Sequence, residues 1–225
     1  MATKPLIGIC LPDKGNFFAY IFIKLNLIIQ RARCVRLRPS KDNIKLDKLD
    51  GLILSGGSDI DPTLYGKNKD AHNTPLDKKR DSFELETIDA IYKKKLPILG
   101  ICRGAQLINI YFNGTLYPKI LDLDEYIIHK NSIFPIKIAI IKKLSNLFSI
   151  TKKKEVVINS IHNQAIDEVG EDLKISACHD KIIEAIEKDD YPFLLGVQWH
   201  PEYLIYLKEH RLIFKSFIMS AKRGE

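Results

Sequence analysis

Apolar runs of strand length alternate with helix-like stretches along the first half of the chain. Four runs have the composition of buried strands: Leu6–Cys10, Cys34–Leu37, Gly51–Ser55 and Pro97–Ile101. Three stretches between or after them have helical patterns: Phe17–Arg31, Ser82–Lys94 and Arg103–Phe112. Near-continuous apolar strands that alternate with helices are typical of a parallel sheet covered on both faces. The pattern predicts an α/β fold with a doubly wound, mostly parallel sheet.

The second half of the chain has strand-like segments with few helices between them. These segments are Ile136–Ile141, Glu155–Ser160, Leu173–Ala177, Ile182–Glu187 and Phe193–Trp199. We expect them to form an antiparallel extension of the parallel sheet, followed by a closing helix at Glu202–Ser220. No repeat, linker or shift in composition divides the chain, so residues 1–225 are predicted to form a single domain.

One of the predicted helices has a clear start signal. Asp81, with Glu84 three residues later, resembles a capping box and predicts that the helix begins at Ser82. The apolar residues of this helix then share one face: Phe83, Ile88, Ile91 and Tyr92.

Composition and charge favour a soluble protein without a nucleic-acid or membrane partner. Of the 225 residues, 45% are hydrophobic and 28% charged, which excludes a disordered or collagenous chain. No apolar run approaches the roughly 18 residues of a membrane span. The short run Leu6–Leu11 ends at Pro12 and is a poor signal peptide, so we expect a cytoplasmic protein. The net charge is +7, but the lysines are scattered, which favours a solvated surface over the alternative of a nucleic-acid face.

The four cysteines are far apart in the sequence, with no spacing typical of a zinc site. We therefore expect free thiols in a reducing compartment and no bound metal. Cys10 and Cys178 lie in strand-like runs and Cys34 opens a strand, so all three are interpreted as structural. Cys102 remains as a candidate nucleophile.

Cys102 lies where an apolar strand runs directly into a helix, in the sequence Gly-Ile-Cys-Arg-Gly. Gly100 and Gly104 permit the tight turn of a nucleophile elbow, with sulfur in place of a hydroxyl. A helix N-terminus favours the thiolate, and the amide of Arg103 is placed to donate to an oxyanion. The alternative is a buried cysteine that ends a strand beside a packing glycine.

His200 and Glu202 are candidates for the base and its orienting carboxylate. The last predicted strand ends at Trp199, so it delivers His200 to the carboxyl edge, where open α/β sheets place their sites. Pro201 stiffens the turn, which lets Glu202 fold back on the imidazole and support its protonated form. Taken alone, His-Pro-Glu fits an ordinary loop, but together with the elbow it favours a catalytic site.

A second strand also ends in glycines at this edge, at Gly56 and Gly57. Backbone without side chains can come close to a ligand and offer an amide opposite that of Arg103. Phosphate binding is the weaker interpretation, because no Lys-Ser/Thr follows the glycines.

Together these elements resemble the class I glutamine amidotransferase superfamily over almost the whole chain. Its triad hydrolases carry a Gly-x-Cys-x-Gly-x-Gln elbow, a Gly-Gly oxyanion strand and a His-Pro-Glu, in this order. The resemblance implies a flavodoxin-like fold, no metal or organic cofactor, and a triad of Cys102, His200 and Glu202. It also implies that the amides of Gly57 and Arg103 form the oxyanion hole.

Finer features are similar to the γ-glutamyl-γ-aminobutyrate hydrolase-like branch. They are Ser-Gly-Gly-Ser-Asp-Ile-Asp-Pro at 55–62, Tyr65-Gly66, Arg80-Asp81 with Glu84, and Asn-Ser-Ile-His-Asn-Gln at 159–164. This branch implies substrate contacts for Gly56, Gln106, Ser160 and His162, although a polar turn is the alternative for His162. We interpret Arg80 and Asp81 as a helix cap and an ion pair outside the site.

The resemblance implies hydrolysis of a small γ-glutamyl amide through a thioester on Cys102, releasing glutamate and an amine. One alternative is a glutaminase subunit that supplies ammonia to a partner synthetase. Another is a non-catalytic binding module, which the intact triad argues against. The amine stays open, because the segment 122–135 around His129 and the first helix depart from the family pattern. Whether the protein forms a homodimer also stays open.

Overall fold

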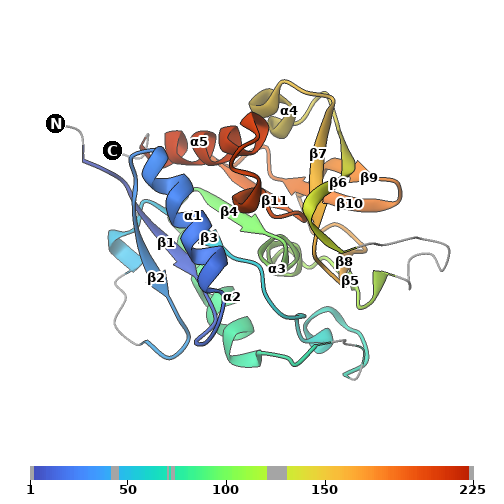
Figure 1. Ribbon diagram of the computed structural model, residues 1–225. Coiled ribbons are helices and arrows are strands. Elements are labelled where there is room, and N and C mark those ends of the chain that lie inside the picture. Colours follow the sequence, from blue (N-terminus) through green and yellow to red (C-terminus); the bar gives the residue numbers. More distant parts are fainter. Residues whose placement is uncertain (1–2, 42–45, 70, 72–73, 121–130, 223–225) are drawn as a thin grey trace.

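The computed structural model describes residues 3–41, 46–69, 71, 74–120 and 131–222 (Figure 1). The helices are α1 (Phe17–Ile29), α2 (Lys78–Lys93), α3 (Arg103–Tyr111), α4 (Asn146–Thr151) and α5 (Lys208–Lys222), with short 3₁₀ helices η1 (Leu46–Lys48), η2 (Pro62–Tyr65) and η4 (Pro201–Leu204). The strands are β1 (Leu6–Cys10), β2 (Arg33–Leu37), β3 (Gly51–Leu54), β4 (Ile98–Ile101), β5 (Leu116–Tyr117), β6 (Ser132–Ile141), β7 (Glu155–Ser160), β8 (Ala165–Ile166), β9 (Lys174–His179), β10 (Ile182–Glu187) and β11 (Leu194–Val197). The predicted departure around His129 lies outside the described residues.

One mixed sheet runs through the molecule in the order β2-β1-β3-β4-β11-β10-β9-β6-β7, with β5 and β8 off this path. The first five of these strands pair in parallel. Their order is that of a flavodoxin-like sheet, with β11 as the fifth strand. The pairs from β11–β10 onward are antiparallel. The predicted α/β fold with a parallel core and an antiparallel extension is confirmed.

Helices cover both faces of the parallel strands (Figure 1). On one face, Ile53 of β3 lies in an apolar cluster with Ile23 of α1 and Phe214 of α5. The next residue, Leu54, belongs to the opposite cluster together with Leu107 of α3 and side chains of α2. Strands buried on both faces explain why their sequences are apolar at every position.

Helix α2 begins at Lys78, four residues before the predicted start at Ser82. Its N-cap is Asp77, whose side chain accepts a hydrogen bond from the backbone amide of Arg80 at 3.1 Å. The prediction that Asp81 and Glu84 form a capping box is therefore wrong. Both carboxylates lie inside the first turns of the helix and bind arginines, so they do not cap it.

Four other elements differ from the predicted pattern. Helix α4 is capped by Ser145, which accepts from the amide of Phe148 at 3.0 Å, but its six residues are too few to show a helical period. The strands β5 and β8 have two residues each and leave no pattern at all. The predicted closing helix divides into η4 and α5, since the turn that starts at Pro201 is 3₁₀ and does not continue into the longer helix.

Glycines, which have no side chain, allow α3 to pack closely against the parallel sheet. A Cβ at Gly104 would lie 2.4 Å from the carbonyl oxygen of Leu54, and one at Gly100 would lie 2.7 Å from the backbone of Gly104. A Cβ at Gly196 of β11 would lie 2.9 Å from Ala105 of α3. These close approaches fix the position of the helix N-terminus relative to β3, β4 and β11.

No helix in the part of the chain that the structure describes is long and apolar enough to cross a membrane.

A buried histidine ties the closing helix to the antiparallel extension. The indole Nε1 of Trp199 donates to Nδ1 of His210 at 3.2 Å, and Nε2 of His210 lies 3.0 Å from the carbonyl oxygen of Val157. Because the indole can only donate, Nδ1 accepts and Nε2 carries the proton, so the ring is neutral. Burial lowers the pKa of His210 from 6.5 to about 4.

We expect acidification from about pH 7 to about pH 4.5 to destabilise the protein partly through His210. The unfolded chain takes up a proton near the ordinary pKa of 6.5, whereas the folded chain does so only near about 4. This contribution is therefore fully present above the ordinary pKa and is lost toward pH 4, with an upper bound of about 3 kcal/mol. Urea unfolding of the wild type and of His210→Gln, which does not titrate, should give a stability difference that shrinks on acidification. Equal losses in the two proteins would contradict the assignment.

Candidate active site

Cys102 lies in the turn between β4 and α3, in a backbone conformation that non-glycine residues rarely adopt, with φ 52° and ψ −107°. Its amide donates to the carbonyl of Val197 at 2.7 Å, which ties the turn to β11. Its thiol lies 3.7 Å from the carbonyl oxygen of Ile161 and accepts from Nε2 of Gln198 at 3.5 Å. This geometry is the strained strand-to-helix turn expected of a nucleophile elbow.

His200 and Glu202 lie beside this turn, as the sequence predicts. Nδ1 of His200 is 2.8 Å from Oε1 of Glu202, and the Glu202 side chain is fully buried. Burial lowers the pKa of His200, but the charge of Glu202 and the charge and hydrogen bond of Cys102 outweigh it and raise this pKa well above its usual value. Since Nδ1 faces Glu202, Nε2 is the nitrogen left for the thiol.

Three neighbours fix the position of His200. Oδ1 of Asn159 accepts from the His200 amide at 2.8 Å, and its Nδ2 donates to the His200 carbonyl at 3.1 Å. The ring of Tyr203 stacks on the imidazole, with the centroids 5.4 Å apart. A Cβ at Gly56 would lie 2.6 Å from Cε1 of His200, so only a glycine fits there. The imidazole therefore has little freedom to turn away from Cys102.

A cavity of about 210 Å³ opens beside the thiol. Its lining residues are Gly57, Ser58, Asp59, Thr74, Cys102, Arg103, Gln106, Asn131, Ile161, His162, Asn163 and Gln164. It is smaller than the roughly 300–1,000 Å³ of pockets for drug-sized ligands, so it suits a group the size of an amino acid.

The predicted substrate-binding residues lie in different environments. His162 lines the cavity, with Nδ1 2.9 Å from the carbonyl oxygen of Gln164. Gln106 also lines it, but its amide nitrogen donates to the Gln164 carbonyl and to Oε1 of Gln198. Gly56 and Ser160 are not among the described lining residues. Gly56 contacts His200, and the Ser160 hydroxyl accepts from Lys137 at 3.1 Å, which makes both of them supporting residues in this arrangement.

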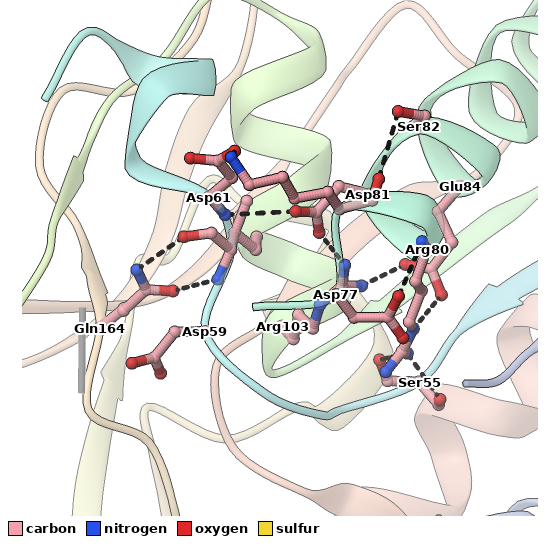
Figure 2. A network of polar contacts seen from close by, with 12 residues as sticks. Ser55, Asp59, Asp61, Asp77, Arg80, Asp81, Ser82, Glu84, Arg103 and Gln164 are labelled. Atoms are coloured by element: carbon pink, nitrogen blue, oxygen red, sulfur yellow. Dashed lines mark hydrogen bonds and ion pairs between the residues drawn. The ribbon is translucent and has the colours of Figure 1, made fainter. Parts of the chain in front are cut away.

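A buried network of two arginines and two carboxylates lies under the loop that follows β3 and the start of α3 (Figure 2). Arg80 binds Glu84 at 2.7 Å, and Arg103 binds both Glu84 and Asp81. Burial raises the pKa of Glu84, but Arg103 and Arg80 outweigh this effect and lower it, so the carboxylate stays ionised. Arg80 also donates to the carbonyl of Ser55 at 3.0 Å.

This network supports both predicted oxyanion donors. Asp81 and Glu84 bind the side chain of Arg103, and the backbone amide of Arg103 is one of these two predicted donors. A Cβ at Gly57, the other donor, would lie 2.2 Å from Nη1 of Arg80. Arg80 and Asp81 each form an ion pair, Arg80 with Glu84 and Asp81 with Arg103, whereas the predicted helix cap is wrong, because Asp77 caps α2. Sequence reasoning placed these residues outside the site, although they position it.

Sequence reasoning also missed Asp59, Asn159 and Gln198 as site residues. Asp59 lies in the cavity lining, and its carboxylate accepts from the amide of Thr74 at 3.1 Å. Gln198 directly precedes the Trp-His-Pro-Glu run, and its position at the end of β11 could have indicated a contact with Cys102.

A larger cavity of about 540 Å³ lies at the other end of β11, between α4 and α5, and none of the predicted site residues lines it. Among the described residues, no group of three or more His, Cys, Asp and Glu is placed to hold a metal ion.

Similarity to known families agrees with this geometry. The model of the Peptidase C26 family matches residues 34–202, more than half of the chain. The chain belongs to this family. The predicted resemblance to class I glutamine amidotransferases is thereby confirmed, and the protein is an enzyme of the hydrolase and amidotransferase-like type.

Two relatives and one solved structure illustrate the match. A glutamine amidotransferase-like protein of Rickettsia prowazekii is 34% identical, over 99% of each chain. The γ-glutamyl-γ-aminobutyrate hydrolase PuuD of Escherichia coli K12 is 30% identical, over 79% of this chain and 74% of its own. The crystal structure of a Thermoplasma acidophilum protein assigned to GMP synthase superposes with a TM-score of 0.72 at 21% identity. It covers 97% of this chain and 95% of its own, and it shows the same fold.

We expect substoichiometric iodoacetamide near neutral pH to modify Cys102 before the other thiols. Burial raises the pKa of Cys10, Cys34 and Cys178, which keeps these thiols protonated and slow to react. Cys102 borders the cavity and lies beside His200, whose pKa its charge helps to raise. Peptide mapping of the wild type and of Cys102→Ala measures the order of labelling. Modification of Cys34 or Cys178 first would contradict the assignment of Cys102 as nucleophile.

Replacing Glu202 with Gln should lower kcat by about 10²- to 10⁴-fold, less than Cys102→Ala or His200→Ala. The amide keeps the shape of the carboxylate but removes the charge that raises the His200 pKa. Steady-state kinetics measure the loss, and thermal unfolding checks that each variant is folded. A wild-type rate for Glu202→Gln would show that Glu202 does not serve His200.

Proposed function

We propose that the protein hydrolyses γ-glutamyl amides to glutamate and an amine, with Cys102 as the nucleophile. The observation that carries this proposal is the arrangement of three residues beside a small cavity. Glu202 binds His200, and His200 lies next to Cys102, which lines the cavity. The membership in the C26 family and the 30% identity to a γ-glutamyl-γ-aminobutyrate hydrolase support it.

In the first half of the reaction, the Cys102 thiolate attacks the γ-carbonyl carbon, and His200 holds the thiol proton. The carbonyl electrons move onto oxygen, where the amides of Gly57 and Arg103 donate to the oxyanion. Collapse of this intermediate breaks the C–N bond as His200 gives its proton to the leaving nitrogen. The products are a free amine and a γ-glutamyl thioester on Cys102.

In the second half, His200 removes a proton from a water molecule, which attacks the thioester carbon. The same two amides stabilise the second oxyanion. Its collapse breaks the C–S bond, releases glutamate and returns the proton from His200 to the sulfur. Glu202 stabilises the imidazolium in both halves without accepting the proton.

The cavity suits the γ-glutamyl half of such a substrate. Its volume of about 210 Å³ fits a group of amino-acid size. Asp59 places a carboxylate in the lining, which complements the α-ammonium group that every γ-glutamyl compound carries. A leaving amine larger than ammonia would extend out of this cavity.

The second candidate function is that of a glutaminase subunit that passes ammonia to a separate synthetase. Its support is that several relatives are named for glutamine amidotransferases, including the Rickettsia prowazekii protein at 34% identity. Both candidates use the same triad and differ in the leaving group and in the need for a partner.

We expect the purified chain alone to release amine and glutamate in equal amounts from γ-glutamyl-γ-aminobutyrate or a similar amide. The reason is that its oxyanion donors need no second protein to be in place, and one such donor contributes on the order of 10² to 10³ in rate. Product analysis on a panel of γ-glutamyl amides, with Cys102→Ala as the control, measures this release.

The same panel includes free glutamine. A larger kcat/KM for glutamine, or activity only after addition of a synthetase, would contradict the hydrolase function and support that of a glutaminase subunit. Release of amine by Cys102→Ala at the wild-type rate would exclude both.

A further inference from the structure

Two side-chain donors from distant parts of the chain converge on the carbonyl oxygen of Gly56. Nδ2 of Asn16 donates to it at 2.7 Å and Nη2 of Arg80 donates to it at 3.2 Å. Asn16 comes from the start of α1 and Arg80 from α2, so two distant segments reach the same peptide group. The reaction described above gives Asn16 no role.

The Gly56 carbonyl and the Gly57 amide belong to one peptide group. The described residues contain no cis peptide bond, and in a trans peptide the C=O and N–H point in opposite directions. Asn16 and Gly56 are not among the described residues that line the cavity, whereas Gly57 is. Holding the carbonyl toward Asn16 therefore turns the Gly57 amide toward the cavity and Cys102.

This peptide group would otherwise be free to rotate. It joins two glycines, and neither has a Cβ to restrict the backbone angles on its side. Rotation by half a turn would aim a carbonyl oxygen at the developing oxyanion and remove one of its two donors. It would also leave the buried Arg80 with one acceptor fewer.

The conformation of Asn16 fits this role. It precedes α1 in the left-handed region, with φ 55° and ψ 26°, and its side chain makes no capping bond to its own helix. The side chain of an asparagine at a helix N-terminus usually accepts such a capping hydrogen bond. Here that side chain reaches across to Gly56.

We propose that Asn16 and Arg80 are positioning residues that hold the Gly56–Gly57 peptide with its amide facing Cys102, before substrate binds. The inference rests on the proposed hydrolase function and deepens it. An oxyanion hole held by the chain's own side chains does not depend on a partner protein to turn this peptide.

Asn16→Gly provides a clean test, because glycine adopts the same left-handed backbone and removes only the donor. Arg80 is less suitable, since removal of one partner from a buried ion pair leaves the other charge unpaired and endangers the fold. Asn16→Asp is a second variant of the same shape, with a carboxylate that cannot donate. Arg31→Gly is the matched control, because Arg31 is exposed, has φ 60° and follows the other end of α1.

We expect kcat for a γ-glutamyl amide to fall by about 10- to 100-fold in Asn16→Gly, with KM within about a factor of two. Asn16→Asp should lose at least as much, and Arg31→Gly should keep the wild-type rate. Alkylation of Cys102 by iodoacetamide forms no oxyanion, so its rate should stay at the wild-type value in all three variants. Affinity for the γ-aldehyde of glutamate, which forms a hemithioacetal on Cys102, should weaken by the same factor as kcat.

Wild-type kcat and aldehyde affinity in Asn16→Gly would overturn the positioning role. A parallel fall in the alkylation rate would overturn it as well, because it would indicate a general disturbance of the elbow. If the wild type hydrolysed no γ-glutamyl amide, the proposed function would fail, but the aldehyde affinities would still test the positioning role separately.

Discussion

Four buried charges hold the elements of this active site in one arrangement. Arg80, Asp81, Glu84 and Arg103 lie almost completely out of contact with water, where a charge without its partner is costly. The loop after β3, the first turns of α2 and the start of α3 must therefore meet in one arrangement that satisfies all four. That arrangement brings Gly57, Arg103 and Cys102 to the lining of the same cavity.

The parallel half of the fold could be predicted well, because burial on both faces leaves a strong signal in the sequence. The strands at Leu6–Cys10 and Gly51–Leu54 are apolar at nearly every position, and few other structures require this. The pattern could not show the two-residue strands, which are too short to have a period. It also misplaced the start of α2, because Asp81 and Glu84 match a cap by spacing while their charges serve arginines from two different elements.

The residues of the candidate site likewise fall into those that the sequence pattern could indicate and those that it could not. Cys102 and His200 could be found because each follows an apolar strand at the carboxyl edge, and parallel strands bring their carboxyl ends together. Asn159, which holds the backbone of His200, comes from β7 at the edge of the antiparallel extension, and no local pattern indicates that it reaches His200. Asn16 is harder still, since its contact with Gly56 depends on how α1 packs against the sheet.

The backbone of Cys102 has a consequence for how this protein can change. A glycine would adopt this positive-φ conformation with less strain, and such strain costs on the order of 1–3 kcal/mol. At this one position, folding and chemistry therefore favour different residues. A substitution of Cys102 by glycine would relieve the backbone strain at the elbow but would also remove the thiol. A gain in stability that leaves the thiol in place has to arise elsewhere in the chain.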